Sequence, residues 1–218
     1  MKKKYEVVIF DLDGTILDTL GDLCAAVNHA LRKRNLPEHT MDEYRQMVGS
    51  GIRNLCRQAL GGESEEVLDQ SLADFKAYYV SHIDVYTRPY EGMVQLMTDL
   101  RAAGVTVAVA SNKFREGALT LCRKFFPEIP ESLVWGDVEG LPLKPRPDMI
   151  ARVMQQFPQG TSCCMVGDSW TDIEAGKAYG CQASVGVSWG YRYTEALYKA
   201  GADAVADTMD DLRSLLLE

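Results

Sequence analysis

The chain has 218 residues, of which 46% are hydrophobic and 25% charged, a composition typical of a folded globular protein and not of a disordered one. Its 31 acidic and 23 basic residues give a net charge of −8, which argues against a general nucleic-acid binder because such proteins carry a basic face. No apolar run approaches the roughly 20 residues that cross a bilayer, so we expect no membrane partner. The cysteines form no Cys-x-x-Cys pair, so we expect reduced thiols and a cytoplasmic protein.

Five short apolar segments recur along the chain, with helical patterns between them. Several are nearly continuous apolar runs, as expected for strands that are buried on both faces of a parallel sheet. One intervening helical pattern begins near Met93 and ends at Gly104. This alternation predicts an α/β fold with a doubly wound, Rossmann-like parallel sheet. The five expected strands are Tyr5–Phe10, Val105–Ala110, Leu133–Trp135, Ser162–Val166 and Ala183–Val187.

The stretch from residue 18 to residue 86 contains no convincing strand. It contains three helical stripes of apolar residues, which begin at Leu20, Ile52 and Val67. We therefore expect an α/β core domain of residues 1–17 and 87–218, and a small all-helical domain of residues 18–86 inserted after the first strand. Ligands of open α/β sheets bind beyond the carboxyl ends of the strands, so the residues that follow each strand are the candidates for a site.

Two carboxylates follow the first strand. Asp11 and Asp13 lie in the sequence Asp-Leu-Asp-Gly-Thr. Two unit charges about 4 Å apart repel by about 4 kcal/mol at an effective dielectric constant near 20, and Mg²⁺ would relieve this repulsion because it binds carboxylates together with phosphate oxygens. Gly14 permits a turn that brings backbone N–H groups toward an anion. An ordinary acidic turn is the alternative interpretation of this motif alone.

Polar residues also follow the next three strands. Ser111 and Asn112 come after the second strand, where they could hold phosphate oxygens or cap a helix. Lys144 follows the third strand beside prolines that can direct its ammonium group, although a solvated loop lysine would look the same. Asp168 and Asp172 follow the fourth strand one helical turn apart, and could serve a metal or a helix start. Because all four strands end at one edge of the sheet, these residues would converge.

Taken together and in this order, the four motifs resemble those of the haloacid dehalogenase-like (HAD) hydrolase superfamily, over nearly the whole chain. The helical insertion resembles a C1-type cap. Segments 11–23, 88–93 and 167–180 resemble the phosphoglycolate phosphatase-like branch of the superfamily. The dehalogenases of the superfamily lack the second aspartate of the first motif, and the presence of Asp13 disfavours that branch.

The resemblance implies a Mg²⁺-dependent phosphatase that hydrolyses a small phosphomonoester, with 2-phosphoglycolate as the specific candidate. Asp11 would attack phosphorus and form an aspartyl-phosphate, and Asp13 would protonate the leaving alkoxide and then activate water. Mg²⁺ would be held by Asp11, by the backbone carbonyl of Asp13 and by Asp168. Asp172 would orient a metal-bound water from outside the coordination sphere.

The same resemblance assigns Ser111, Asn112 and Lys144 to the phosphoryl oxygens. The residues from Gly49 to Arg53 resemble the family's substrate-specificity loop, and Arg53 could pair with a substrate carboxylate or a second phosphate. An exposed helix residue is the alternative interpretation of Arg53. We expect a monomer or homodimer whose partner is a small phosphorylated metabolite.

Other functions remain open for this sequence. A pyrophosphatase, a nucleotidase or a sugar phosphatase of the same fold would share the core motifs. A phosphotransferase would pass the phosphoryl group to a second alcohol. A non-catalytic binding protein on this fold would be expected to have lost one of Asp11, Asp13, Lys144 or Asp168, and the chain keeps all four.

Overall fold

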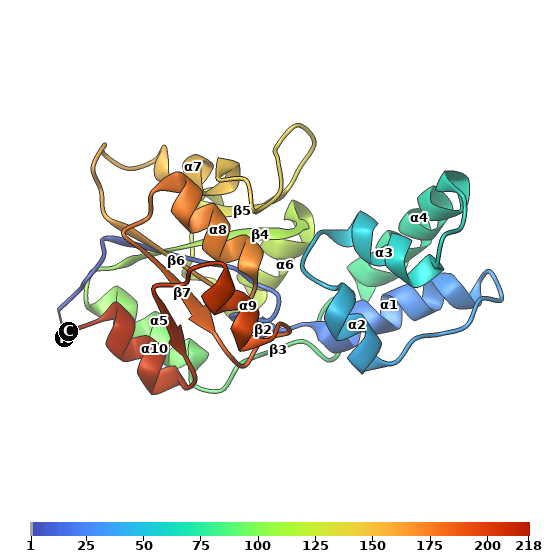
Figure 1. The fold of residues 1–218 in the computed structure, drawn as a ribbon, viewed down its shortest axis with the longest axis horizontal. Helices are drawn as coiled ribbons and strands as arrows, with labels where there is room; N and C mark the ends of the chain where they lie inside the picture. The colour runs from blue at the N-terminus through green and yellow to red at the C-terminus, as the bar shows by residue number, and fades with distance from the viewer. Residues whose placement is uncertain (1) are drawn as a thin grey trace.

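The computed structural model describes residues 2–218 and contains a six-stranded parallel sheet flanked by helices (Figure 1). The predicted α/β fold class is therefore confirmed. The order of the strands is β5-β4-β1-β6-β7-β8. The strands are β1 (Val7–Phe10), β4 (Thr106–Phe114), β5 (Val134–Asp137), β6 (Cys163–Gly167), β7 (Ala183–Val187) and β8 (Ala204–Ala206).

The chain reverses its direction across the sheet beside β1. From β1 it proceeds outward to β4 and β5, and it then returns to β6 on the other side of β1. This topological switch point lies between β1 and β6, where ligands of open α/β sheets bind. Helices cover both faces, with α7 packed on α8 and α10 packed on α5. The core helices are α5 (Met93–Ala102), α6 (Arg115–Phe125), α7 (Asp148–Met154), α8 (Trp170–Tyr179), α9 (Thr194–Lys199), α10 (Met209–Leu216) and the short 3₁₀ helix η1 (Glu131–Leu133).

All five expected strands are present, with two differences. β4 continues four residues beyond its expected end at Ala110 and includes the motif that was expected to follow it. β8 was not predicted, because it has three residues and only Ala206 among them is fully buried. Such a short segment lacks the continuous apolar pattern on which strand prediction relies.

Four helices occupy the insertion between β1 and β4: α1 (Leu20–Arg32), α2 (Met41–Met47), α3 (Ile52–Leu60) and α4 (Glu65–Ser81). Figure 1 shows them grouped beyond one end of the sheet. We call these helices and their loops the cap; its boundaries at residues 18 and 86 stay a prediction. The two connections to the core, β2 (Leu17–Asp18) and β3 (Arg88–Pro89), pair antiparallel. α2 was missed because its apolar pattern is weak, although its capping box of Thr40 and Glu43 is a helix-start signal.

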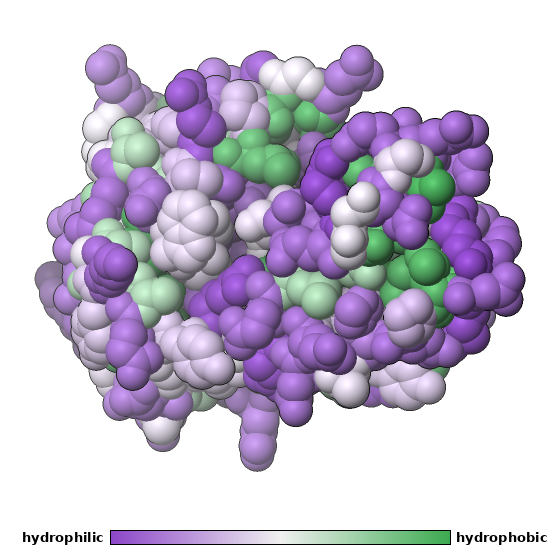
Figure 2. Space-filling model, turned by 45° about the vertical axis from the view of Figure 1, so that its right-hand side comes forward, coloured by the Kyte–Doolittle hydropathy of each residue, from purple (hydrophilic) through white to green (hydrophobic). Residues whose placement is uncertain are grey.

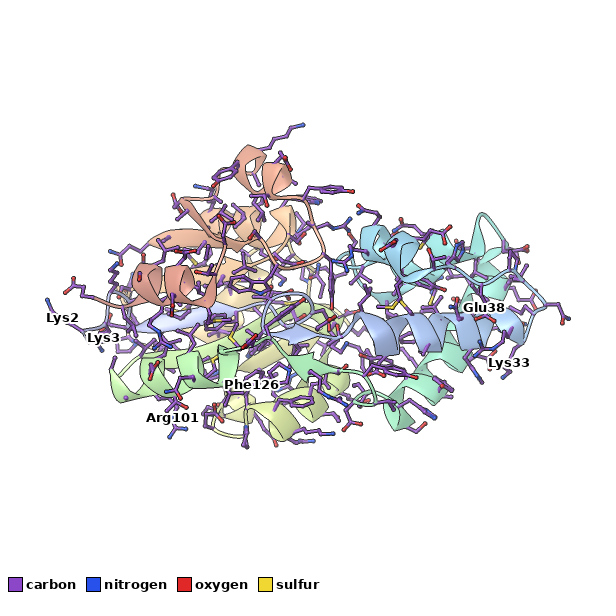
Figure 3. All side chains as sticks on the ribbon, turned by 90° about the horizontal axis from the view of Figure 1, so that it is seen from below. Lys2, Lys3, Lys33, Glu38, Arg101 and Phe126 are labelled. Carbon is purple, nitrogen blue, oxygen red and sulfur yellow. The ribbon has the colours of Figure 1, made fainter. Side chains whose placement is uncertain are left out.

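The two ends of the chain lie together, far from the cap. Lys3 forms an antiparallel bridge with Leu217, and Figure 3 places Lys2 and Lys3 at the opposite end of the molecule from Lys33 and Glu38 of the cap. On the face drawn in Figure 2 the surface is mostly hydrophilic, and its hydrophobic residues lie in small groups. Within residues 2–218, no helix is long and apolar enough to cross a membrane.

Candidate functional site

The carboxyl ends of the strands meet the cap at one cavity. Its empty volume is about 530 Å³, part of which is open to solvent, and this size suits a small molecule. The cavity is lined by the candidate residues that follow the first four of the five predicted strands, and the structure therefore brings them together: Asp11, Asp13, Ser111, Asn112, Lys144, Asp168 and Asp172.

Three buried carboxylates form the floor of the cavity. Asp11 follows β1, Asp168 follows β6 and Asp172 lies in the first turn of α8; one oxygen of each lies within 4.8 Å of the others. Their exposed fractions are 7%, 3% and 1%. Several anionic oxygens at this spacing suit a hard divalent cation such as Mg²⁺. Asp172 was expected outside the coordination sphere, but its carboxylate is as close to the cluster as the other two.

Lys144 neutralises part of this negative charge. Its Nζ lies 2.7 Å from Asp11 Oδ1 and 2.6 Å from Asp172 Oδ1, and it donates a hydrogen bond to the Ala110 carbonyl at 2.6 Å. Burial would lower the pKa of this ammonium, but the two carboxylates outweigh burial and raise the pKa to about 12. Lys144 therefore carries a positive charge at neutral pH.

The carboxyl groups of Asp168 and Asp172 hold their protons more tightly than an ordinary aspartic acid does. Burial, followed by the charges of Asp172 and Asp11, raises the pKa of Asp168 to about 8. Burial also raises the pKa of Asp172 to about 6, although the Lys144 ammonium opposes this shift. A metal ion must displace these protons, because carboxylates bind metals in their ionised form.

The backbone around the floor is built to approach Asp168 closely. The N–H of Tyr191 donates to Asp168 Oδ2 at 2.6 Å, and the Asp168 N–H donates to the Thr15 hydroxyl at 3.1 Å. Gly14 has a φ of +83°, and a Cβ atom there would lie 2.6 Å from Asp168 Oδ2; a Cβ at Gly190 would lie 2.2 Å from Asp168 Cβ. Both positions therefore require glycine.

Asp13 lies beside the floor and contacts different partners. The Thr19 hydroxyl donates to Asp13 Oδ1 at 2.7 Å, and Lys113 Nζ lies 3.1 and 3.3 Å from its two carboxylate oxygens. Lys113 Nζ also donates to the hydroxyl of Tyr79, a residue of cap helix α4, at 2.7 Å. Burial would lower the pKa of Lys113, but Asp13 and Tyr79 together raise it above its ordinary value.

An irregularity in the sheet aims the end of β4 at the cavity. Three residues of β4, 111 to 113, stand opposite Gly136 of β5 where regular pairing would place one residue. A Cβ at Gly136 would lie only 2.5 Å from the Lys113 carbonyl, so the bulge depends on this glycine. Ser111 is buried and lines the cavity, and its contact with phosphate stays a prediction.

Asn112 connects the core to the cap. Its Nδ2 donates to the carbonyls of Lys144 and Gly49, both at 3.0 Å, and its Oδ1 accepts the Lys144 N–H at 2.8 Å. These bonds use both hydrogens of the Asn112 amide, so Asn112 has no free N–H for its predicted contact with phosphate. Arg192, in the loop after β7, holds the same cap loop by donating to the carbonyls of Gln46, at 2.7 Å, and Val48.

The structure does not bring Arg53 to the cavity. Its guanidinium pairs on the protein surface with Asp69 and Glu65 of α4, each at 2.7 Å. Apolar residues form the cap wall of the cavity instead: Leu23, Val48, Ile52, Leu55 and Phe75.

Several residues of the site carried no predicted role, among them Lys113, Thr15 and Tyr191. Lys113 and Thr15 belong to motifs that were recognised, but neither was given a contact. Tyr191 lies outside the motifs. The sequence signal for Lys113 was its place directly after Ser111 and Asn112; the contacts of Tyr191 come from a loop distant in sequence, which no local pattern reveals.

Comparison with known proteins places this site in a family. The family model described as haloacid dehalogenase-like hydrolase matches residues 5–180. A phosphoglycolate phosphatase of Colwellia psychrerythraea is 33% identical over 218 residues, 95% of each chain. A phosphoglycolate phosphatase of Pseudomonas putida is 35% identical over 224 residues, which are 96% of this chain and 78% of that protein.

Solved structures agree with the sequence matches. A crystal structure from Lactobacillus delbrueckii subsp. bulgaricus superposes with a TM-score of 0.89 at 31% identity, covering 100% of this chain and 99% of that one. A predicted phosphoglycolate phosphatase from Haemophilus somnus gives a TM-score of 0.84 at 27% identity and 97% coverage of both chains. The chain belongs to the haloacid dehalogenase-like hydrolases, which confirms the resemblance of its motifs. The matches favour the phosphoglycolate phosphatase-like branch within that family.

Proposed function

We propose that the protein is a Mg²⁺-dependent phosphatase and that it hydrolyses 2-phosphoglycolate. The observation that carries the proposal is a buried aspartate, Asp11, held 2.7 Å from a lysine ammonium within a cluster of three carboxylates at the switch point of the sheet. Relatives named phosphoglycolate phosphatase that align along 95% of the chain support the choice of substrate.

Asp11 is the nucleophile of the proposed reaction. A phosphomonoester dianion repels an anionic nucleophile, so positioning and charge neutralisation provide most of the catalysis. Lys144 and the hydroxyl of Ser111 hold the phosphoryl oxygens in line with the Asp11 carboxylate. Attack forms an aspartyl-phosphate and releases the alcohol, and water then hydrolyses this acyl phosphate.

Asp13 is the acid and base of the proposed reaction. It protonates the leaving alkoxide and later takes a proton from the attacking water. The Thr19 hydroxyl, at 2.7 Å from Oδ1, orients the Asp13 carboxylate through a hydrogen bond that does not depend on the substrate.

The oxygens of Asp11, Asp168 and Asp172 fit a hard divalent cation, and the backbone carbonyl of Asp13 is a further proposed ligand. When bound, Mg²⁺ supplies positive charge beside the phosphoryl group. Tyr191 and Thr15 hold Asp168 in place for this role. Burial and the neighbouring carboxylates raise the pKa values of Asp168 and Asp172, which shows that three adjacent negative charges are unfavourable there. A bound cation would therefore stabilise the ionised form of the site.

The cap closes the site in this proposal. Its apolar wall excludes bulk water but not the single attacking water, and opening and closure allow the substrate to enter and the product to leave. We further propose a cytoplasmic monomer or homodimer. The cytoplasmic location is supported by six free cysteines, five of them buried, since reduced thiols are typical of that compartment.

Phosphate release from a panel of substrates tests the proposal. The panel contains 2-phosphoglycolate, a nucleoside monophosphate, a sugar phosphate and pyrophosphate, each with Mg²⁺ and with EDTA. We expect Mg²⁺-dependent release with the highest kcat/KM for 2-phosphoglycolate, and loss of release in Asp11→Asn, which keeps the shape of the side chain. Release by pure Asp11→Asn near the wild-type rate would refute the nucleophile, and a higher kcat/KM for another compound would reassign the substrate.

A further inference from the structure

The leaving group of the proposed substrate carries a carboxylate, which needs a cationic partner in the cavity. Among the described residues that line the cavity, Lys113 and Lys144 are the only cationic side chains. Lys144 is assigned to the phosphoryl group in the proposed reaction, and it already contacts Asp11, Asp172 and the Ala110 carbonyl. The cap wall is apolar, and Arg53 lies outside the cavity.

Lys113 has a different set of partners. Its side chain is 2% exposed, and its ammonium contacts the Asp13 carboxylate and the Tyr79 hydroxyl. One N–H can serve the Asp13 carboxylate and a second can serve Tyr79, which leaves a third for a ligand. Tyr79 does not itself line the cavity. Its hydroxyl and its ring, whose centroid lies 4.7 Å from Nζ, hold the ammonium from the cap side.

We infer that Lys113 binds a carboxylate on the carbon next to the leaving oxygen of the substrate, and that Tyr79 positions Lys113 for this contact. The inference rests on the proposed function, in which Asp13 touches the leaving oxygen at hydrogen-bond distance. Lys113 Nζ is 3.1 Å from Asp13 Oδ1. A carboxylate that is separated from the leaving oxygen by one carbon is therefore within reach of Lys113 Nζ.

This assignment makes the enzyme selective for 2-phosphorylated short carboxylic acids. A carboxylate that enters the cavity beside its apolar cap wall loses water of hydration and gains one charged hydrogen bond, to Lys113. Such a bond corresponds to a preference of about 10- to 100-fold in kcat/KM over a neutral analogue of the same length. A carboxylate one methylene further from the ester oxygen would pass beyond Lys113 and meet the apolar cap wall.

The test compares 2-phosphoglycolate with 2-hydroxyethyl phosphate, which has the same length and no carboxylate. We expect the wild type to prefer 2-phosphoglycolate by about 10- to 100-fold. In Lys113→Met this ratio should fall to nearly one, chiefly through a higher KM for 2-phosphoglycolate, whatever happens to kcat for both substrates. Tyr79→Phe keeps the cation and should lower the ratio by about threefold at most.

Three outcomes would overturn the inference. They are an unchanged ratio in folded Lys113→Met, a ratio that collapses in Arg53→Ala instead, and a wild type with no preference for the carboxylated substrate. The last outcome, with Mg²⁺-dependent hydrolysis intact, would leave the proposed phosphatase standing, whereas absence of all hydrolysis would overturn both proposals.

The wild type alone provides a second test, which does not depend on whether Lys113→Met folds. The phosphate ester of 3-hydroxypropionate carries its carboxylate one methylene further away. We expect its kcat/KM to be lower than that of 2-phosphoglycolate by about 10-fold or more. Equal values for the two esters would contradict binding by Lys113.

Discussion

Replacement of Lys144 by methionine tests the charge balance of the site. Each of its two ion pairs, at 2.7 and 2.6 Å, is worth about 6 kcal/mol at an effective dielectric constant of 20. Desolvation of the ammonium offsets much of this attraction, and removal of one partner of a buried pair costs about 3–5 kcal/mol. We therefore expect Lys144→Met to lower the free energy of unfolding of the metal-free protein by about 3–5 kcal/mol.

The size of this loss should depend on pH and on Mg²⁺. The charge of Lys144 opposes the upward pKa shifts of Asp168 and Asp172, so both pKa values rise further in the variant. A carboxyl group whose pKa is raised by folding contributes stability at low pH that is lost as the pH rises. The loss caused by the variant should therefore be smaller at pH 5 than at pH 8. Mg²⁺ should recover much of it by supplying the missing positive charge.

Urea denaturation followed by circular dichroism, at pH 5 and pH 8 and with and without Mg²⁺, measures these effects. Lys177→Met is the matched control, because Lys177 is a half-exposed lysine paired with Asp203 at 3.5 Å and should change stability by about 1 kcal/mol at most. A loss in Lys144→Met no larger than that of the control, or a loss that is equal at both pH values, would refute this account of the site.

Three further predictions address the metal, the turn after β1 and the cap. The affinity for Mg²⁺ should increase between pH 6 and pH 9, because binding must displace protons from Asp172 and Asp168. Their pKa values are about 6 and about 8. A constant affinity in calorimetry over this range would contradict these pKa values. Gly14→Ala should weaken Mg²⁺ binding by about 10-fold or more, because the added Cβ displaces Asp168. Gly140→Ala is the control, because Gly140 has nearly the same positive φ but no atom lies within 4 Å of the added Cβ. This control should cost about 1 kcal/mol of stability and leave the Mg²⁺ affinity measured by calorimetry unchanged. Arg192→Met removes two hydrogen bonds to the cap loop and should raise KM several-fold with little change in Mg²⁺ affinity; an unchanged KM would show that the loop needs no such anchor.

The floor of the site could be predicted from the sequence because it depends on topology. Each buried apolar run ends at a definite residue, and parallel strands present these ends at one edge of the sheet. The relative positions of Asp11 and Asp168, which directly follow β1 and β6, come from that rule without knowledge of side-chain packing, whereas Lys144 reaches the floor from the longer loop after β5. The same rule placed the cavity at the correct edge of the sheet.

The cap side of the site depends on contacts that no local pattern records. Arg53 lies in the first turn of α3, next to a loop that resembles a specificity loop, and its position alone suggested a substrate contact. Its actual partners, Glu65 and Asp69, lie one turn apart on α4. They reach Arg53 because α3 packs against α4, and the packing of two helices is a tertiary property. Asn112 was likewise placed at a strand end, but its bond to Gly49 depends on the docked position of the cap.

The bulge in β4 is the structural basis for the proposal that the core, as well as the cap, recognises the leaving group. Regular pairing of β4 with β5 would place one residue opposite Gly136, but three residues stand there, and both Ser111 and Lys113 line the cavity. In the proposed reaction Ser111 binds the phosphoryl group and Lys113 binds the leaving group. Tyr79 completes the site of Lys113 from α4. Tyr79 contacts Lys113 across the boundary between cap and core, so on this proposal binding of the substrate carboxylate and closure of the cap stabilise each other.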